Sequence, residues 1–168
     1  MEKLDLTLDE MKLVTAAYNG EEAYIKLPLP KKNENEEEKT IVLSFTDVNL
    51  FDGGVEGFGV GKNVDVFYPK IDYDIIRRVG TENQIINVPD FVLKAFLAMR
   101  RNKKVSLYAF IDEPQKVKDE FNSHFLAFGE YYVTSISKGE ISFEKKDSNV
   151  SFSFVDGVGM DLDLDILE

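Results

Sequence analysis

The sequence predicts a single α+β domain with a mixed or mostly antiparallel sheet, two to three helices and a C-terminal β-meander. Its 168 residues suit one domain with a real core. Apolar residues recur at the helical period in some segments and at every second position in others. We expect residues 1–158 to form the domain and residues 159–168 to be an acidic C-terminal tail or an edge strand.

The N-terminal segment is predicted to be a helix. Thr7 and Glu10 match a capping box, in which each side chain satisfies a backbone amide at the start of a helix. The helix should run to about Tyr18, and Gly20 is a plausible stop. An alternative is that residues 3–8 begin as a short strand.

A hairpin with a long charged loop is expected next. Residues 22–27 and 40–45 have strand patterns, and the prolines after residue 27 end the first strand. Residues 31–39 contain no apolar side chain, so burial cannot offset their ordering entropy. We predict a flexible loop there; an acidic docking patch is the functional alternative.

A glycine-rich stretch occupies residues 52–62. A phosphate-binding loop would need glycine where Glu56 stands and Ser or Thr where Asn63 stands, and the dinucleotide fingerprint fails at Lys62. We therefore predict a mobile or tightly turning loop between strands. A strand at residues 64–68, a helical turn at 73–79 and a short strand at 84–88 are expected to follow.

The densest apolar material lies between residues 88 and 137. A nearly buried helix is predicted over residues 90–101 and a central strand over 105–111. The spacing of apolar residues then predicts a second helix from Asp112 to Phe128, stopped by Gly129. Strand 130–137 would complete a parallel strand–helix–strand crossover. The phenylalanines that favour this second helix are Phe121, Phe125 and Phe128.

A β-meander is predicted after this block. Strands at residues 131–137, 140–144 and 149–155 follow one another, and Lys138-Gly139 suits the first tight turn. Alternating apolar and polar residues predict that one face of this sheet meets the core and the other faces water.

No catalytic or metal-binding pattern emerges from the sequence. The chain has no Cys and one histidine, so thiolate and multi-histidine metal sites are excluded. The histidine, His124, is interpreted as a packing or surface residue. The Asp161, Asp163 and Asp165 run opens like a calcium loop but lacks the later glycine and glutamate. We predict a non-enzymatic protein without a cofactor or metal.

The start of the chain lacks a secretory signal pattern, and no apolar stretch approaches the length of a membrane span. We therefore expect a cytoplasmic protein that does not enter a membrane.

Charge is the most informative compositional feature. The chain carries a net charge of −11, divided into −7 over residues 1–60, +4 over 61–110 and −8 over 111–168. Acidic surfaces steer association with basic targets, so we predict a non-catalytic binding module, such as an inhibitor, immunity-type or regulatory protein, for a partner with a basic surface. The predicted partner-binding residues are Asp161, Asp163, Asp165 and Glu168.

An alternative function uses the basic middle of the chain. Basic side chains can neutralise phosphates, and the interleaved Tyr68, Tyr73 and Tyr108 can stack on bases. The alternative prediction is therefore a single-stranded nucleic-acid accessory protein with an acidic tail. Its predicted nucleic-acid-binding residues are Arg77, Arg78, Arg100, Arg101, Lys103 and Lys104.

Overall fold

The computed structural model describes residues 4–29, 31–61, 64–80, 83–111, 124–145, 150–155 and 160–168. Within them the α+β class is confirmed, as are two α-helices and a C-terminal meander. The elements are α1 (Leu8–Asn19), β1 (Ala23–Pro28), β2 (Thr40–Phe51), β3 (Gly54–Gly61), β4 (Val64–Ile71), the 3-10 helix η1 (Tyr73–Ile75), β5 (Arg78–Val79), α2 (Asp90–Arg101), β6 (Val105–Ile111), β7 (His124–Ser137), β8 (Glu140–Lys145), β9 (Val150–Val155) and β10 (Met160–Ile166).

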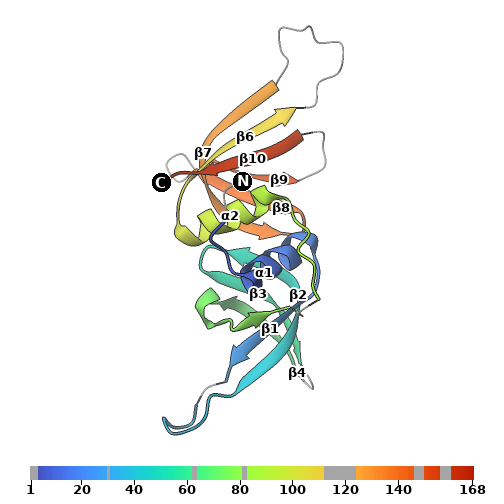
Figure 1. Ribbon diagram of the computed structural model, residues 1–168, viewed down its shortest axis with the longest axis vertical. Coiled ribbons are helices and arrows are strands. Elements are labelled where there is room, and N and C mark those ends of the chain that lie inside the picture. Colours follow the sequence, from blue (N-terminus) through green and yellow to red (C-terminus); the bar gives the residue numbers. More distant parts are fainter. Residues whose placement is uncertain are drawn as a thin grey trace.

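The described strands form one sheet in which every pair is antiparallel. Its main path runs β10-β6-β7-β2-β1-β5; β3 and β4 branch from β2, and β8 and β9 branch from β7. In Figure 1 the molecule is elongated, with β6, β7 and β10 toward one end and β1, β2 and β4 toward the other. Both helices lie between these ends, against the sheet.

The predicted parallel crossover is wrong, because β6 and β7 are antiparallel neighbours. The predicted helix is also wrong at residues 124–128, which belong to β7; residues 112–123 lie outside the described part of the chain. Gly129 has a φ of 105° but does not end a helix. It lies at a register shift opposite Leu107, where β7 carries one extra residue, the geometry of a β-bulge. Aromatic residues suit strands as well as helices, so the phenylalanine spacing was ambiguous.

The glycine-rich stretch is a strand rather than the predicted loop. Only Asp52 and Gly53 form the turn, and residues 54–61 pair with both β2 and β4 as β3. A Cβ atom on Gly54 would collide with the backbone carbonyl of Ile71. Glycine therefore serves the close approach of neighbouring strands here, and not the approach of a ligand.

The N-terminal helix follows the sequence prediction closely. The Thr7 hydroxyl accepts from the Glu10 N–H at 3.1 Å, and the Glu10 carboxylate accepts from the Thr7 N–H at 3.1 Å, so the capping box is confirmed. Gly20 ends the helix in the left-handed conformation. The turn between β7 and β8 satisfies a carbonyl at this end of α1, because the Lys138 N–H donates to the Ala17 carbonyl at 2.8 Å.

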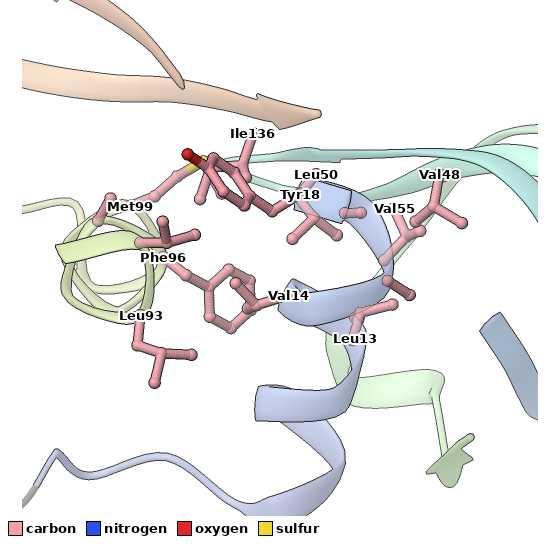
Figure 2. Close-up of a cluster of buried hydrophobic side chains, with 14 of the residues drawn as sticks. Leu13, Val14, Tyr18, Val48, Leu50, Val55, Leu93, Phe96, Met99 and Ile136 are labelled. Carbon is pink, nitrogen blue, oxygen red and sulfur yellow. The ribbon is translucent and has the colours of Figure 1, made fainter. Parts of the chain in front are cut away.

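The core lies where the two helices meet the sheet. Figure 2 shows Val14 and Tyr18 of α1 facing Phe96 and Met99 of α2, with side chains of β2, β3 and β7 nearby. Phe96 is fully buried, and its ring meets the Tyr73 ring edge-on with centroids 5.3 Å apart. The predicted buried helix over residues 90–101 is thus confirmed. Leu50, Val55 and Ile136 of the sheet belong to the same core and are fully buried.

Between the hairpin and α2 the prediction holds only in part. The expected helical turn is shorter, covering η1 alone, and Arg78 and Val79 instead form β5 against β1. The strand expected at residues 84–88 is absent, since residues 83–88 have no regular structure.

The C-terminal residues form β10, an edge strand that pairs with β6 along its whole length. Leu164 is fully buried and Ile166 packs on the core. The Leu167 N–H donates to the Lys104 carbonyl, so the odd-numbered residues of β10 point their backbone groups at β6. The Leu164 N–H therefore points to the free edge, where the Asp163 carboxylate accepts it at 2.8 Å. A carboxylate that satisfies an edge amide discourages a further strand from pairing there.

No helix in the described residues is long and apolar enough to cross a membrane.

Phe96→Ala is expected to lower the free energy of unfolding by about 3–5 kcal/mol, because it leaves a cavity among fully buried side chains. Denaturant unfolding measures the loss. Ile85→Ala is the control, since Ile85 is 80% exposed and its truncation should change stability by less than about 0.5 kcal/mol. A loss below about 1 kcal/mol for Phe96→Ala would contradict its place in the core.

Deleting residues 160–168 is expected to lower the melting temperature strongly, because it exposes β6 and removes the buried Leu164. Leu164→Ala alone should cost about 2–5 kcal/mol. Thermal unfolding followed by circular dichroism measures both. An unchanged melting temperature after the deletion would mean that β10 is not part of the folded domain in solution.

Candidate functional site

The sheet presents two chemically different faces. Side chains on the inner face, such as Val133, Ile141 and Phe143, are buried beneath the helices. Because side chains alternate along a strand, their neighbours point to the outer face, away from the helices. The outer face of β10, β6, β7 and β8 gathers carboxylates and tyrosines, and it is the strongest candidate for a functional surface in the described residues.

Asp163 is the most highly bonded residue of this surface. One of its oxygens, Oδ1, accepts from the Leu164 N–H and lies 3.4 Å from the Lys94 ammonium of α2. The other, Oδ2, accepts from the Tyr108 hydroxyl at 3.2 Å. These contacts fix the carboxylate in one orientation at the edge of the sheet.

The pKa of Tyr108 is raised by partial burial and by the negative charge of this surface. Partial burial, then the charges of Asp163 and Asp165 and hydrogen bonds to both, raise the pKa of Tyr108 from 10.0 to about 12. Both carboxylates act in the same direction, because a tyrosinate beside them would be a third negative charge. The hydroxyl therefore stays protonated and keeps donating to Asp163 to a higher pH than an ordinary tyrosine would.

Strand register continues the surface across the sheet. Asp165 lies opposite Ser106, which lies opposite Glu130, and Tyr132 lies opposite Glu144. The Lys104 ammonium also lies at this face, 5.7 Å from the centre of the Tyr132 ring. We call this surface the acidic patch; it consists of Tyr108, Glu130, Tyr132, Glu144, Asp163 and Asp165.

The residues predicted to bind a partner are only partly brought together. Asp163 and Asp165 share the outer face of β10. Asp161 lies opposite Phe110 in the register, and its side chain is outside the described residues. Glu168 is exposed and lines, together with Asp165, a pocket of about 350 Å³ between α2 and β10. That pocket has an apolar floor and a rim of mixed charge that includes Asp5, Lys94 and Arg101.

The residues predicted to bind nucleic acid do not form a continuous basic surface. Arg77 pairs with Glu38 at 2.8 Å, Arg101 with Asp5 at 3.0 Å, and Arg100 with Glu10 at 2.8 Å. Of the others, Arg78 is on β5, Lys103 follows α2, and Lys104 belongs to the acidic patch.

Arg100 instead connects α2 to α1 and to η1 through contacts with their side chains. Its guanidinium also lies 3.3 Å from Asp74 and 4.9 Å from the centre of the Tyr73 ring. The Tyr73 hydroxyl donates to the Phe51 carbonyl at 2.6 Å, and burial raises the pKa of Tyr73. A pocket of about 330 Å³ adjoins these residues, but both ends of the Arg100 guanidinium are already occupied by carboxylates.

The described residues contain no group of three or more His, Asp or Glu side chains that could hold a metal ion. His124 lies in β7, opposite Ile111, rather than in the predicted helix.

The chain matches no protein-family model, no curated protein and no solved structure.

Sequence reasoning missed Glu130, Tyr132 and Glu144 and assigned Tyr108 to the basic middle. Alternation within β6 did place Tyr108 and Ser106 on one face. The antiparallel placement of β10 beside β6, which brings the aspartates to Tyr108, has no local signal in the sequence.

Asp163→Asn is expected to lower the pKa of Tyr108 from about 12 toward 10.0, since it removes a negative charge and a carboxylate acceptor. Ultraviolet titration of tyrosinate measures this, with Tyr108→Phe identifying the signal. Glu21→Gln, an exposed site outside the patch, should leave that pKa unchanged.

The same shift makes stability depend on pH. The unfolded chain loses the Tyr108 proton near pH 10.0 and the folded chain near pH 12. Between these values the folded state binds more protons, so the free energy of unfolding falls as pH rises. Tyr108→Phe should remove that part of the decline, and a Tyr108 that titrates near 10 in the unsubstituted chain would contradict the described contacts.

Proposed function

We propose that this protein is a non-catalytic binding module whose acidic patch docks on a basic surface of a protein partner. The observation that carries the proposal is the outer face shared by Asp163, Asp165 and Glu130, on which the two aspartates place negative charge beside Tyr108. Carboxylates held in place before binding lose less conformational freedom when a cation approaches, which favours association.

The distribution of ion pairs within the chain supports an acidic binding surface and a basic partner. The five basic residues Arg77, Lys94, Arg100, Arg101 and Lys138 each contact a carboxylate within the chain. The net charge of −11 means that acidic groups far outnumber cations. A surface with excess negative charge accelerates encounters with positively charged partners and slows encounters with negatively charged ones.

Tyrosines add contact area to the patch. Tyr108 and Tyr132 are both half-buried, so each offers part of an aromatic ring beside a carboxylate. An aromatic face attracts ammonium and guanidinium groups, and Lys104 already lies over Tyr132. The combination favours Lys or Arg side chains on the partner.

The alternative of single-stranded nucleic-acid binding has less support. Arg77, Arg100 and Arg101 would each have to leave a carboxylate to reach a phosphate. The carboxylates left behind would then repel the phosphate, which lowers the affinity.

Binding of a labelled lysine-rich peptide tests the proposal. The chain should bind this peptide with an affinity that falls as salt rises, and it should not bind a single-stranded oligothymidylate. The double substitution Asp165→Asn with Glu130→Gln should weaken peptide binding about 3- to 10-fold, because exposed charge pairs contribute roughly 0.5 kcal/mol each.

Glu21→Gln with Glu22→Gln is the matched control. It changes the net charge equally at exposed positions outside the patch, so it should reduce peptide binding much less. Equal losses for the two double variants would mean that total charge, and not the acidic patch, decides binding. Preference for the oligothymidylate would overturn the proposal in favour of nucleic acid.

A further inference from the structure

The other end of the same outer sheet face carries basic and apolar side chains instead of acidic ones. Tyr24, Val42 and Phe58 are 40%, 57% and 48% exposed there, although each belongs to a strand of the sheet. Lys26 lies directly between Arg78 and Val42 in the register, so two cations accompany these apolar side chains. We call this surface the basic–apolar patch; it consists of Tyr24, Lys26, Val42, Phe58 and Arg78.

The burial of the neighbouring residues shows that this patch lies on the outer face of the sheet. The residues that alternate with it, among them Ile25, Leu43 and Phe45, are almost fully buried on the side of the helices. Leu50 and Ile136 are partners across β2 and β7, and both are fully buried. The helix-covered face is therefore continuous from one patch to the other, and so is the outer face. In Figure 1 the strands that carry the two patches extend toward opposite ends of the molecule.

Part of the outer face between the patches carries short polar side chains. Ser135 and Ser142 are partners in the β7–β8 ladder, and Ser135 also lies opposite Phe51 of β2. Such side chains allow the outer faces of two sheets to approach to about 10 Å, the usual spacing of stacked sheets.

We propose that this chain forms a two-fold dimer in which the outer sheet faces of two copies stack. The basic–apolar patch of each copy lies on the acidic patch of the other. This inference rests on the proposed function, because it names a second copy of the chain as the basic partner of the acidic patch.

Two-fold symmetry follows from the placement of the patches. One face with an acidic end and a basic end is complementary to itself after a half-turn about an axis between the ends. Both contacts then form at once and the assembly closes, whereas a single contact would leave one patch of each copy open and produce chains. Stacking covers Tyr24, Val42 and Phe58, and removal of apolar surface from water is the general driving force of association.

Charge complementarity gives the dimer its register. Lys26 and Arg78 of one copy face Asp165 and Glu130 of the other, and a stack in the parallel sense would place like charges together. Like-charge juxtaposition across an interface opposes association, so the antiparallel arrangement is selected.

Sedimentation equilibrium over a wide concentration range tests the dimer, with two charge-reversal variants. Lys26→Glu with Arg78→Glu reverses the basic–apolar patch, and Asp165→Lys with Glu130→Lys reverses part of the acidic patch. Each variant alone should dimerise at least about tenfold more weakly than the unsubstituted chain. Circular dichroism and the melting temperature verify that both variants fold.

Mixing the two variants provides the decisive measurement. In the mixed dimer one contact has the original charges and the other has both signs exchanged, so affinity should return toward that of the unsubstituted dimer. Glu21→Gln with Glu22→Gln serves again as the control and should dimerise normally.

Three results would overturn the inference. One is a chain that stays monomeric up to about 1 mM, the weak end of the affinity scale. Another is a series of larger assemblies in place of a dimer, and the third is a dimer that neither reversal weakens. The lysine-rich peptide separates these failures from failure of the proposed function: Lys26→Glu with Arg78→Glu leaves the acidic patch intact, so this variant should still bind the peptide even if no dimer exists.

Discussion

Packing of both helices against one face of a single antiparallel sheet is the constraint on which the rest of this structure depends. Val14 and Tyr18 from α1 and Phe96 from α2 fill the space above β2 and β7, within a core that also includes buried side chains of β1, β6, β8 and β10. A one-sided core favours alternation along the strands, because the buried apolar residues must point to the side of the helices. The outer face is thereby left to polar, charged and aromatic side chains, and its chemistry can vary without loss of the fold.

Several separate elements are joined by a few polar contacts around this core. Arg100 at the end of α2 holds Glu10 of α1 and Asp74 of η1, while the Tyr73 ring stands between the guanidinium and Phe96. The β7–β8 turn closes the other end of α1 through the backbone amides of Lys138 and Gly139. Both ends of α1 are therefore tied to segments distant in sequence, which fixes its position over the sheet.

Charge has two roles in this chain. Four basic residues of the middle segment neutralise carboxylates brought to them by the fold: Arg100 contacts Glu10 and Asp74, and the other three form the Arg77–Glu38, Arg101–Asp5 and Lys94–Asp163 pairs. Exposed pairs of this kind contribute little stability. Their larger effect is on recognition, because they leave the negative charge of the acidic patch dominant at one end of the outer face.

Local signals in the sequence determined the elements whose cause is local. The Thr7–Glu10 capping box, the burial of residues 90–101 and the Lys138-Gly139 turn depend on residues within a few positions of one another, and each was predicted. Helical spacing of Phe121, Phe125 and Phe128 misled the prediction, since aromatic residues also favour strands and the choice at residues 124–128 is made by pairing with β6. Only the tertiary structure decided strand order. Strand pairing requires a partner but no particular distance along the chain, so nothing within residues 105–111 indicates that β10 will lie beside β6 and place Asp163 and Asp165 at Tyr108. The aspartates themselves could be predicted as site residues from their spacing, whereas the face that they share with Glu130 and Glu144 depends on pairing between distant segments.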